Sequence, residues 1–369
     1  MIGNSQHGFG PFRPPGPDAG AAMLRADRGI APSLTESGFS DAVRQPQANY
    51  AALDLGTNNC RLLIARPARG GFRVIDAFSR IVRLGEGLSA TGELSETAMA
   101  RTIEALKLCA GKIGQRRVTA GRFVATEACR RADNCNEFLE RVRDEIGIEI
   151  EIISTAEEAR LVVAGCAPLL HSRIPYALVF DIGGGSTEIV WLRRRGSASG
   201  SREAPEMLGS VSLPFGVVTF TERFGGIEVS PAIYRAMVAE AEAALQPFER
   251  EHGIRREVRA RQVQMLGSSG TVTTLAGVHL ALPRYIRAFV DGSMLTFDQI
   301  ELVSRHLAGL DIEGRAANPC VGRERADLVL SGCAILDAIC AIWPVGRLRV
   351  ADRGIREGIL FELMQGAPG

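Results

Sequence analysis

The sequence contains the same short pattern twice, and this repeat constrains the fold more than any other feature of the chain. An apolar run, Tyr50–Leu55, ends in Asp54-Leu55-Gly56-Thr57-Asn58, and a second apolar run follows. The run Tyr176–Phe180 ends in Asp181-Ile182-Gly183-Gly184-Gly185-Ser186-Thr187, again with an apolar run behind it. Each copy predicts a strand, an Asp-x-Gly turn and a second strand. The duplication predicts two similar α/β domains that face each other, with a ligand in the cleft between them.

The remaining predicted elements alternate between strands and helices. Ser95 is the expected cap of a helix, and a strand is expected over Arg122–Ala125. Further strands are expected at Phe72–Arg80, Ile148–Ile153, Met207–Leu213, Gln264–Leu266 and Arg347–Ala351, and helices at 135–145 and 156–170. We expect one domain to contain residues 48–126 and 353–369 and the other to contain residues 127–352, with a boundary near residue 170 as the alternative.

The first 47 residues differ from the rest of the chain. They are rich in Gly, Pro, Ser and Ala and have no hydrophobic periodicity. Such a composition cannot bury enough apolar surface to offset the entropy of ordering. Residues 1–47 are therefore a predicted disordered N-terminal tail.

Composition and charge exclude several classes of protein. The net charge of +1 supplies no overall field for a nucleic-acid polymer or an anionic membrane. No run of eighteen apolar residues predicts a membrane span, and the N-terminus has no apolar signal core. The eight cysteines contain no CxxC pair, which is typical of reduced, cytoplasmic proteins and argues against a structural zinc site. Anion binding must therefore come from local geometry.

The two glycine-containing turns are candidate phosphate sites. Backbone N–H groups in such turns point outward together and can hold phosphate oxygens. Gly56, Thr57 and Asn58 belong to the first turn, and Gly183, Gly184, Gly185, Ser186 and Thr187 to the second. Three consecutive glycines are costly in conformational entropy, which favours a close approach of backbone to ligand. An ordinary hairpin turn is the alternative, chiefly for the first copy.

A third candidate phosphate site precedes a predicted helix near Val272–His279. It has the sequence Gly267-Ser268-Ser269-Gly270-Thr271 and follows a short predicted strand. Free N–H groups and the helix dipole favour an anion at such a helix start. A capped helix behind a flexible loop is the alternative. The sequence is not a Walker A loop, because no Gly-Lys-Ser/Thr follows.

Four acidic residues are candidates for chemistry. Asp54 and Asp181, one from each domain, could share a hydrated Mg²⁺ or Mn²⁺, or each could simply stabilise its own turn. Glu127 follows a predicted strand and could orient or deprotonate a water, with Arg130 close by to hold phosphate; a surface Glu–Arg pair is the alternative. Glu158 lies in the first turn of a predicted helix, where the dipole alone favours an acid.

Seven motifs in order resemble the Ppx/GppA phosphatase family, over about residues 48–369. They are Asp54-Leu55-Gly56-Thr57-Asn58, Val82-Arg83-Leu84-Gly85-Glu86-Gly87-Leu88, Ala125-Thr126-Glu127-Ala128-Cys129-Arg130, Ser154-Thr155-Ala156-Glu157-Glu158-Ala159-Arg160, Asp181-Ile182-Gly183-Gly184-Gly185-Ser186-Thr187, Gly267-Ser268-Ser269-Gly270-Thr271 and Arg353-Gly354-Ile355-Arg356-Glu357-Gly358.

The resemblance implies a fold, an activity and roles for several residues. It implies two actin-like domains (ribonuclease H-like, of the actin, sugar-kinase and heat-shock-chaperone superfamily) and water attack on polyphosphate or guanosine pentaphosphate, releasing orthophosphate. Glu127 would match the catalytic glutamate and Glu158 a second functional acid, while Asp54 and Asp181 would hold the metal. The chain resembles the short two-domain form without the additional helical region of long members, which argues against processive digestion of long chains.

Two other functions stay open at this point. A kinase on the same scaffold would move phosphate from ATP to a small acceptor, and a nucleotide-binding regulator would turn over weakly. Phosphate release without any acceptor distinguishes hydrolysis from phosphotransfer. Neither the substrate nor assembly as a homodimer follows from the sequence.

Overall fold

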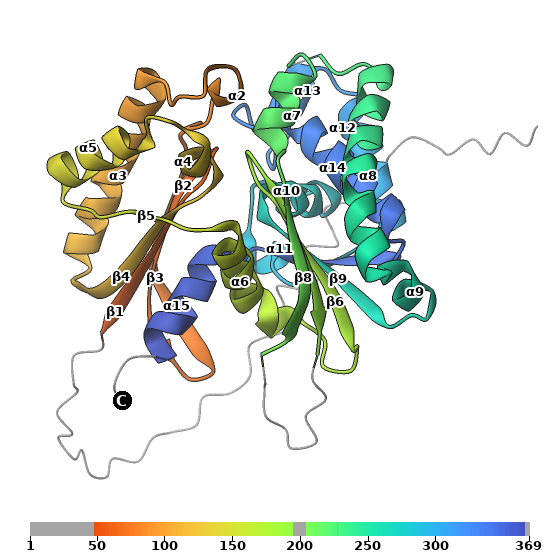
Figure 1. Ribbon diagram of the computed structural model, residues 1–369, viewed down its shortest axis with the longest axis horizontal. Helices are drawn as coiled ribbons and strands as arrows, with labels where there is room; N and C mark the ends of the chain where they lie inside the picture. The colour runs from red at the N-terminus through yellow and green to blue at the C-terminus, as the bar shows by residue number, and fades with distance from the viewer. Residues whose placement is uncertain (1–47, 195–203, 227, 366–369) are drawn as a thin grey trace, which may run out of the picture.

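The computed structural model describes residues 48–194, 204–226 and 228–365, which form two α/β domains side by side (Figure 1). The predicted tail, residues 1–47, lies outside this range, as do residues 195–203 of the Gly/Ser/Arg-rich segment between two strands. In the described parts of the chain, no helix combines the length and the apolar character needed to cross a bilayer.

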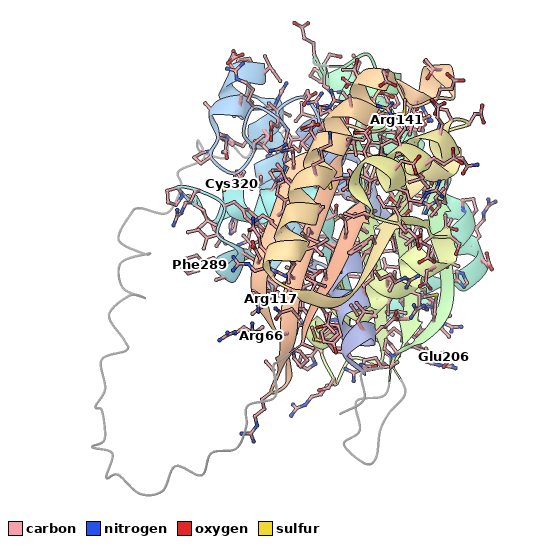
Figure 2. The ribbon with its side chains drawn as sticks, turned by 90° about the vertical axis from the view of Figure 1, so that its left-hand side faces the viewer. Arg66, Arg117, Arg141, Glu206, Phe289 and Cys320 are labelled. Carbon is pink, nitrogen blue, oxygen red and sulfur yellow. The ribbon has the colours of Figure 1, made fainter. Side chains whose placement is uncertain are left out.

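The first domain is built on a five-stranded sheet with the order β3-β2-β1-β4-β5. The strands are β1 (Asn49–Leu55), β2 (Asn59–Ala68), β3 (Gly71–Ile81), β4 (Val118–Ala125) and β5 (Glu151–Ile152). Ala51, Leu53 and Leu55 pack on one face against α3 (Glu96–Gln115) and α5 (Cys135–Ile146). Figure 2 shows α3 crossing in front of this sheet, with Arg141 marking α5. As expected, the Ser95 hydroxyl caps α3 by accepting from the N–H of Ala98.

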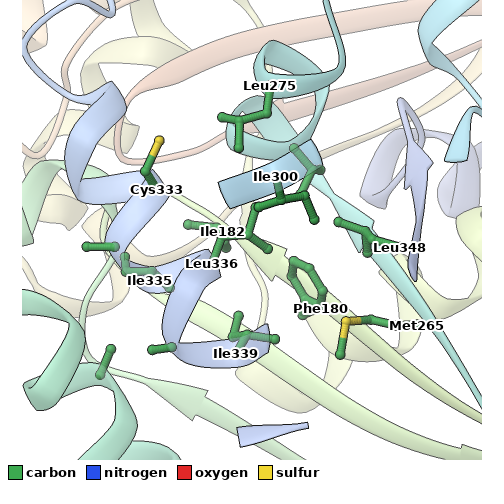
Figure 3. Packing of buried hydrophobic residues seen from close by; sticks show 14 of the residues in the cluster. Phe180, Ile182, Met265, Leu275, Ile300, Cys333, Ile335, Leu336, Ile339 and Leu348 are labelled. Atoms are coloured by element: carbon green, nitrogen blue, oxygen red, sulfur yellow. The ribbon is translucent and has the colours of Figure 1, made fainter. Parts of the chain in front are cut away.

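The second domain is built on a six-stranded sheet with the order β10-β11-β9-β6-β7-β8. Its strands are β6 (Tyr176–Ile182), β7 (Thr187–Arg193), β8 (Glu206–Leu213), β9 (Val263–Ser268), β10 (Met294–Thr296) and β11 (Arg347–Ala351). Its outer face packs against α7 (Val217–Arg223), α8 (Pro231–His252), α9 (Ile254–Arg259), α10 (Ser269–His279), α12 (Phe297–Ala308) and α14 (Val329–Ile342), with α13 (Ile312–Ala317) beside them. Figure 3 shows Phe180 and Met265 of the sheet against Leu336 and Ile339 of α14.

Two helices, α6 (Thr155–Cys166) and α15 (Ile355–Gln365), pack between the sheets and join the domains. One apolar cluster contains Tyr50 and Leu63 of the first sheet, Val179 of the second, and residues of both helices. The helices cross closely at Gly165, where an added Cβ would lie 2.1 Å from the carbonyl oxygen of Gly354. The two sheets are therefore held in a fixed relation at the base of the cleft.

The division between the sheets falls between β5 and β6. The boundary predicted at residue 127 does not coincide with it, because β5 pairs in parallel with β4 and so belongs to the first sheet. The alternative boundary near residue 170 lies between these strands. The strand predicted at Ile148–Ile153 is reduced to Glu151–Ile152, and it ends there because Ser154 caps α6.

Candidate active site

The two Asp-x-Gly turns pack against each other at the top of this interdomain contact. An added Cβ on Gly184 would lie 3.1 Å from the Cβ of Asn58, and one on Gly185 would lie 2.6 Å from the Thr57 hydroxyl. Gly184 and Gly185 are therefore needed because they let the second turn approach the first turn. A close approach of the backbone to a ligand would be a second reason for glycine at these positions. Within the described residues, the N–H groups of Gly184 and Gly185 donate no hydrogen bond. They remain available to a ligand.

Five carboxylates line one small cavity of about 70 Å³ between these turns: Asp54, Glu127, Glu158, Asp181 and Glu188. Asp54 and Asp181 lie near the ends of β1 and β6, which are inner strands of the first and the second sheet. Glu127 begins α4 (Glu127–Arg131), and Glu158 lies in the first turn of α6. Four of the five were predicted from the sequence. The fifth, Glu188, was not predicted; it is the second residue of β7, directly after the second turn.

Arg130 holds two of these acids in place. Its Nη2 donates to Glu127 Oε2 (2.9 Å), and its Nη1 donates to Glu158 Oε2 (2.8 Å) and to the Ile153 carbonyl (2.9 Å). Both bonds to carboxylates are charge-assisted and short, so they fix the orientation of both acids. Arg130 was expected to bind phosphate. Because its guanidinium is already occupied and it does not line the cavity, we reassign it as the positioning residue for Glu127 and Glu158.

Desolvation in the cavity raises the pKa values of these acids. The pKa of Asp54 and that of Asp181 lie above their usual values, although the charge of Arg61 opposes the shift of both. The pKa of Glu158 is also raised, by burial and by the charge of Glu188, while Arg130 opposes the shift. Burial and Asp181 raise the pKa of Glu188 to about 7. A positive ligand between these acids would relieve their repulsion.

The surroundings of Asp54 and Asp181 fit a divalent metal ion. Magnesium typically takes one or two carboxylates and completes its shell with water and phosphate oxygens. Nowhere in the described ranges are three or more His, Cys, Asp or Glu side chains grouped so that they could hold an ion by themselves. The amide side chains of Asn58 and Asn59 each have a buried oxygen without a partner in the first turn, so further hydrogen-bonding capacity faces the same space.

The third predicted phosphate site forms the border between β9 and α10. The helix begins at Ser269 instead of near Val272. Ser269 has φ 81°, a left-handed conformation that is strained for a residue with a side chain, and it borders the acid cavity. Ser269, Gly270 and Thr271 also line a cavity of about 50 Å³ beside the turns. Ser268 donates to the Arg353 carbonyl (2.7 Å) and thereby joins the site to the start of α15.

Two predicted phosphate ligands have structural roles instead. The Thr187 hydroxyl is fully buried and donates to the Phe215 carbonyl (2.8 Å). An added Cβ on Gly267 would lie 2.6 Å from the Phe180 ring, so this glycine is required for packing beneath α10. The other predicted positions in the three turns, from Gly56 to Asn58, from Gly183 to Ser186, and from Ser268 to Thr271, all border a cavity of the site.

Two arginines of the site were missing from the sequence-based prediction. Arg61 on β2 borders both the acid cavity and the cavity beside the turns, and Arg325, before α14, borders the latter. Among the residues that the structure describes, neither forms an ion pair with a carboxylate; Arg325 contacts only the Thr274 hydroxyl (3.3 Å) through its side chain. Burial and the charge of Arg61 lower the pKa of Arg325. Unpaired, partly buried guanidinium groups are suited to a phosphate anion.

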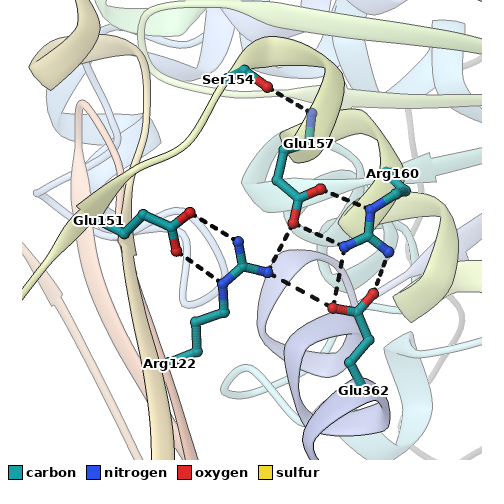
Figure 4. Close-up of polar contacts among 6 residues, drawn as sticks. All are labelled: Arg122, Glu151, Ser154, Glu157, Arg160 and Glu362. Atoms are coloured by element: carbon teal, nitrogen blue, oxygen red, sulfur yellow. Dashed lines mark hydrogen bonds and ion pairs between the residues drawn. The ribbon is translucent and has the colours of Figure 1, made fainter.

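Glu157, the neighbour of Glu158, points away from the site. It accepts from Arg122 (2.8 Å) and Arg160 (2.7 Å), and the network continues to Glu151 and Glu362 (Figure 4). These bonds join β4, β5, α6 and α15. Glu157 therefore has a structural role at the start of α6 and takes no part in the acid cavity. The favourable interactions lower its pKa to about 2, with Arg160 as the largest cause.

Comparisons with known proteins agree with this architecture. The model of the Ppx/GppA phosphatase family matches residues 63–367. A guanosine-5'-triphosphate,3'-diphosphate pyrophosphatase of Photobacterium profundum is 30% identical over 322 residues, which cover 85% of this chain and 59% of the relative, so the chain spans about three fifths of that protein.

Solved structures show the same fold. A Ppx/GppA family member of Aquifex aeolicus matches with a TM-score of 0.70 and 30% identity over 88% of this chain and 100% of its own. An exopolyphosphatase of Cytophaga hutchinsonii matches in fold, with a TM-score of 0.75, 23% identity, and coverage of 87% and 99%. The two domains have the actin-like architecture of these structures. The chain belongs to the Ppx/GppA phosphatase family.

Proposed function

We propose that the chain hydrolyses phosphoanhydride bonds and releases terminal orthophosphate from polyphosphate, from guanosine pentaphosphate, or from both. The observation that carries the proposal is the position of Glu127. Its Oε2 is engaged by Arg130, whereas its Oε1 accepts no hydrogen bond within the described residues and the side chain borders the cavity between the phosphate turns. A carboxylate oxygen held in that position can orient a water and accept its proton.

The other residues of the cavity supply charge and orientation. The free N–H groups of Gly184 and Gly185, the Ser186 hydroxyl and the Arg61 guanidinium surround the space where the terminal phosphoryl group would lie. Preorganised donors of this kind stabilise the charge that spreads over the phosphoryl oxygens in the transition state. Arg130 keeps Glu127 directed at the water. No acceptor other than water is needed for this arrangement.

We propose that Asp54 and Asp181 hold Mg²⁺ or Mn²⁺. When bound, the ion would neutralise phosphate charge. The two half-buried carboxylates, with their raised pKa values, and the unpartnered amide oxygens of Asn58 and Asn59 support this assignment. We also place the chain in the cytoplasm, because all eight cysteines are free thiols.

The test compares phosphate release from polyphosphate, guanosine pentaphosphate and ATP, each without an acceptor. Glu127→Gln should lower turnover by about 10²–10⁴-fold, because the amide cannot accept a proton. Glu157→Gln is the matched control: it lies on the Arg122–Arg160 network outside the cavity and should keep turnover close to wild type. Wild-type protein that releases no phosphate from any of the three would refute the proposed hydrolysis. Glu127→Gln that retains over about a tenth of turnover would remove Glu127 as the base.

A further inference from the structure

One of the seven sequence motifs, residues 82–88, has no role in the site described so far. It forms a loop directly after β3 that lies against the first Asp-x-Gly turn, and it is called the bracing loop below. The N–H groups of its first two residues both donate to the Asn58 carbonyl (2.9 and 3.0 Å), and the N–H of Gly85 donates to the Thr57 carbonyl (3.0 Å). An added Cβ on Gly85 would lie 2.4 Å from Cγ2 of Thr57, so the loop and the turn are in close contact.

These bonds determine which way the first turn presents its own N–H groups. The carbonyl and the N–H of a trans peptide point to opposite sides. Because the Thr57 carbonyl points to the bracing loop, the N–H of Asn58 points away from it, toward the second turn, where an added Cβ on Gly184 would lie 3.1 Å from the Asn58 nitrogen. This N–H donates no hydrogen bond within the described residues and is available to a phosphate oxygen.

The side chain of Arg83 extends from the bracing loop to the second domain. Its Nη2 pairs with Asp327 (3.0 Å) and donates to the Glu324 carbonyl (3.2 Å). These two residues lie on either side of Arg325, which borders the cavity beside the turns, as does Asn58. Arg83 therefore holds Asn58 of the first domain through its backbone and the segment that carries Arg325 of the second domain through its side chain.

The backbone of Arg83 is strained, and the loop around it is tied down on both sides. Arg83 has φ 47°, a left-handed conformation that is unfavourable for a residue with a side chain and persists only where surrounding contacts hold it. A second contact joins the loop to the second domain, because the N–H of Gly87 donates to Glu222 on α7 (2.9 Å). On the side of the first domain, Arg101 on α3 donates to the carbonyls of the first two loop residues.

We propose that Arg83 is a positioning residue for the hydrolysis: it holds the first turn and the Arg325 segment in the arrangement in which both can bind one phosphoryl group. This inference rests on the proposed function. Arg83 itself borders neither the acid cavity, nor the cavity beside the turns, nor the adjoining cavity of about 350 Å³. A variant that adopts the arrangement only part of the time loses apparent affinity by that fraction, whereas the complex, once formed, reacts normally. Loss of the Arg83 contacts should therefore raise KM more than it lowers kcat.

The experiment measures kcat and KM of Arg83→Gln with tripolyphosphate, long polyphosphate and guanosine pentaphosphate. The ratio kcat/KM should fall about three- to tenfold, as expected for a partly exposed charge-assisted contact. KM should rise by the same factor for every substrate that the wild type hydrolyses, because all of them share the terminal phosphoryl group. Arg83→Lys keeps the charge and should restore part of the affinity. Asp327→Asn added to Arg83→Gln should cause little further loss, because both changes remove one contact.

Two other variants complete the comparison. Glu222→Ala removes the second contact between the bracing loop and the second domain, and it should also raise KM more than it lowers kcat. Arg141→Gln is the matched control, because Arg141 pairs with Glu96 (2.8 Å) within the first domain and away from the loop. It should leave kcat and KM unchanged. Melting temperatures check that all variants are folded.

The outcomes separate this inference from the proposed function. Wild type that releases phosphate, together with wild-type KM values for Arg83→Gln and Glu222→Ala, would overturn the inference and leave the function standing. A rise in KM for one substrate alone would overturn it too, because Arg83 would then contact that substrate directly. Fully additive losses in the double variant would show that Arg83 does not act through Asp327. Wild type that releases no phosphate would overturn both.

Discussion

The pKa of Glu188 predicts that this active-site residue makes the metal-free protein less stable as the pH rises. Its carboxylate is buried and accepts a hydrogen bond from the Ser212 hydroxyl (2.9 Å), and its pKa is raised from 4.5 to about 7 by burial and by Asp181. The folded protein therefore binds this proton more tightly than the unfolded chain. The stabilisation is present below about pH 4.5 and is lost as the pH rises through about 7.

The size of the effect follows from the two pKa values. A difference of about 2.5 in pKa corresponds to about 3 kcal/mol of unfolding free energy, of which about 2 kcal/mol is lost between pH 5.5 and 8.5. Glu188→Gln is isosteric and does not titrate, so it should lack this loss. Its melting temperature relative to wild type should rise by about 4–8 °C between those pH values.

The assay is thermal unfolding in EDTA at both pH values, with Glu157→Gln as the control. The pKa of Glu157 is lowered to about 2, so this residue stays ionised across the window and its removal should shift the melting temperature equally at both pH values. Magnesium should reduce the difference between Glu188→Gln and wild type, because a cation at Asp181 opposes the repulsion. An equal shift for Glu188→Gln at both pH values would show that Glu188 is ionised throughout, and the account of the acid cavity would be wrong.

Three further perturbations test the site. Gly185→Ala should lower turnover at least about tenfold, because its Cβ would lie 3.1 Å from Glu127 Cγ and would push against the residue that positions the water; phosphate release measures this, and unchanged turnover would contradict it. Asp327→Asn removes the charge partner of Arg83 (3.0 Å), which is a contact between the two domains, and should raise KM more than it lowers kcat. Solution scattering should show a more open molecule; identical scattering and KM would contradict this. EDTA should abolish turnover and Mg²⁺ or Mn²⁺ should restore it, whereas full activity in EDTA would remove the metal from Asp54 and Asp181.

The duplicated turns made the fold and the centre of the site accessible from the sequence. Strand periodicity and the glycines located β1, β2, β6 and β7, and those strands bring Asp54 and Asp181 to one cavity. Such local signals persist because each strand–turn–strand unit is largely determined by its own residues. The family resemblance then supplied the role of Glu127, which local chemistry alone left equal to a surface ion pair.

Residues whose roles depend on distant partners were harder to predict. Arg130 lies three positions after the catalytic candidate Glu127 in the sequence, yet its contacts with Glu158 and Ile153 direct it away from the cavity. Arg325 is more than 250 positions from Arg61 along the chain, and only the packing of the two domains brings both to one cavity. The choice between the two predicted boundaries, residue 127 and a position near residue 170, was open for a similar reason: β5 has two residues, too few for periodicity to show which sheet it joins.

The distribution of charge along the cleft determines which phosphate can be attacked. The acids Glu127, Glu158 and Glu188 border a cavity of about 70 Å³, whereas Arg287, Arg325 and Arg356 border a contiguous cavity of about 350 Å³. Glu158 and Glu188 border the same small cavity as Glu127, and in their ionised form they would repel any phosphate beyond the one beside Glu127. A bond in the middle of a chain would require phosphate on both sides of the acid cavity. Under the proposed hydrolysis, we therefore expect cleavage at chain ends, with release of one orthophosphate at a time.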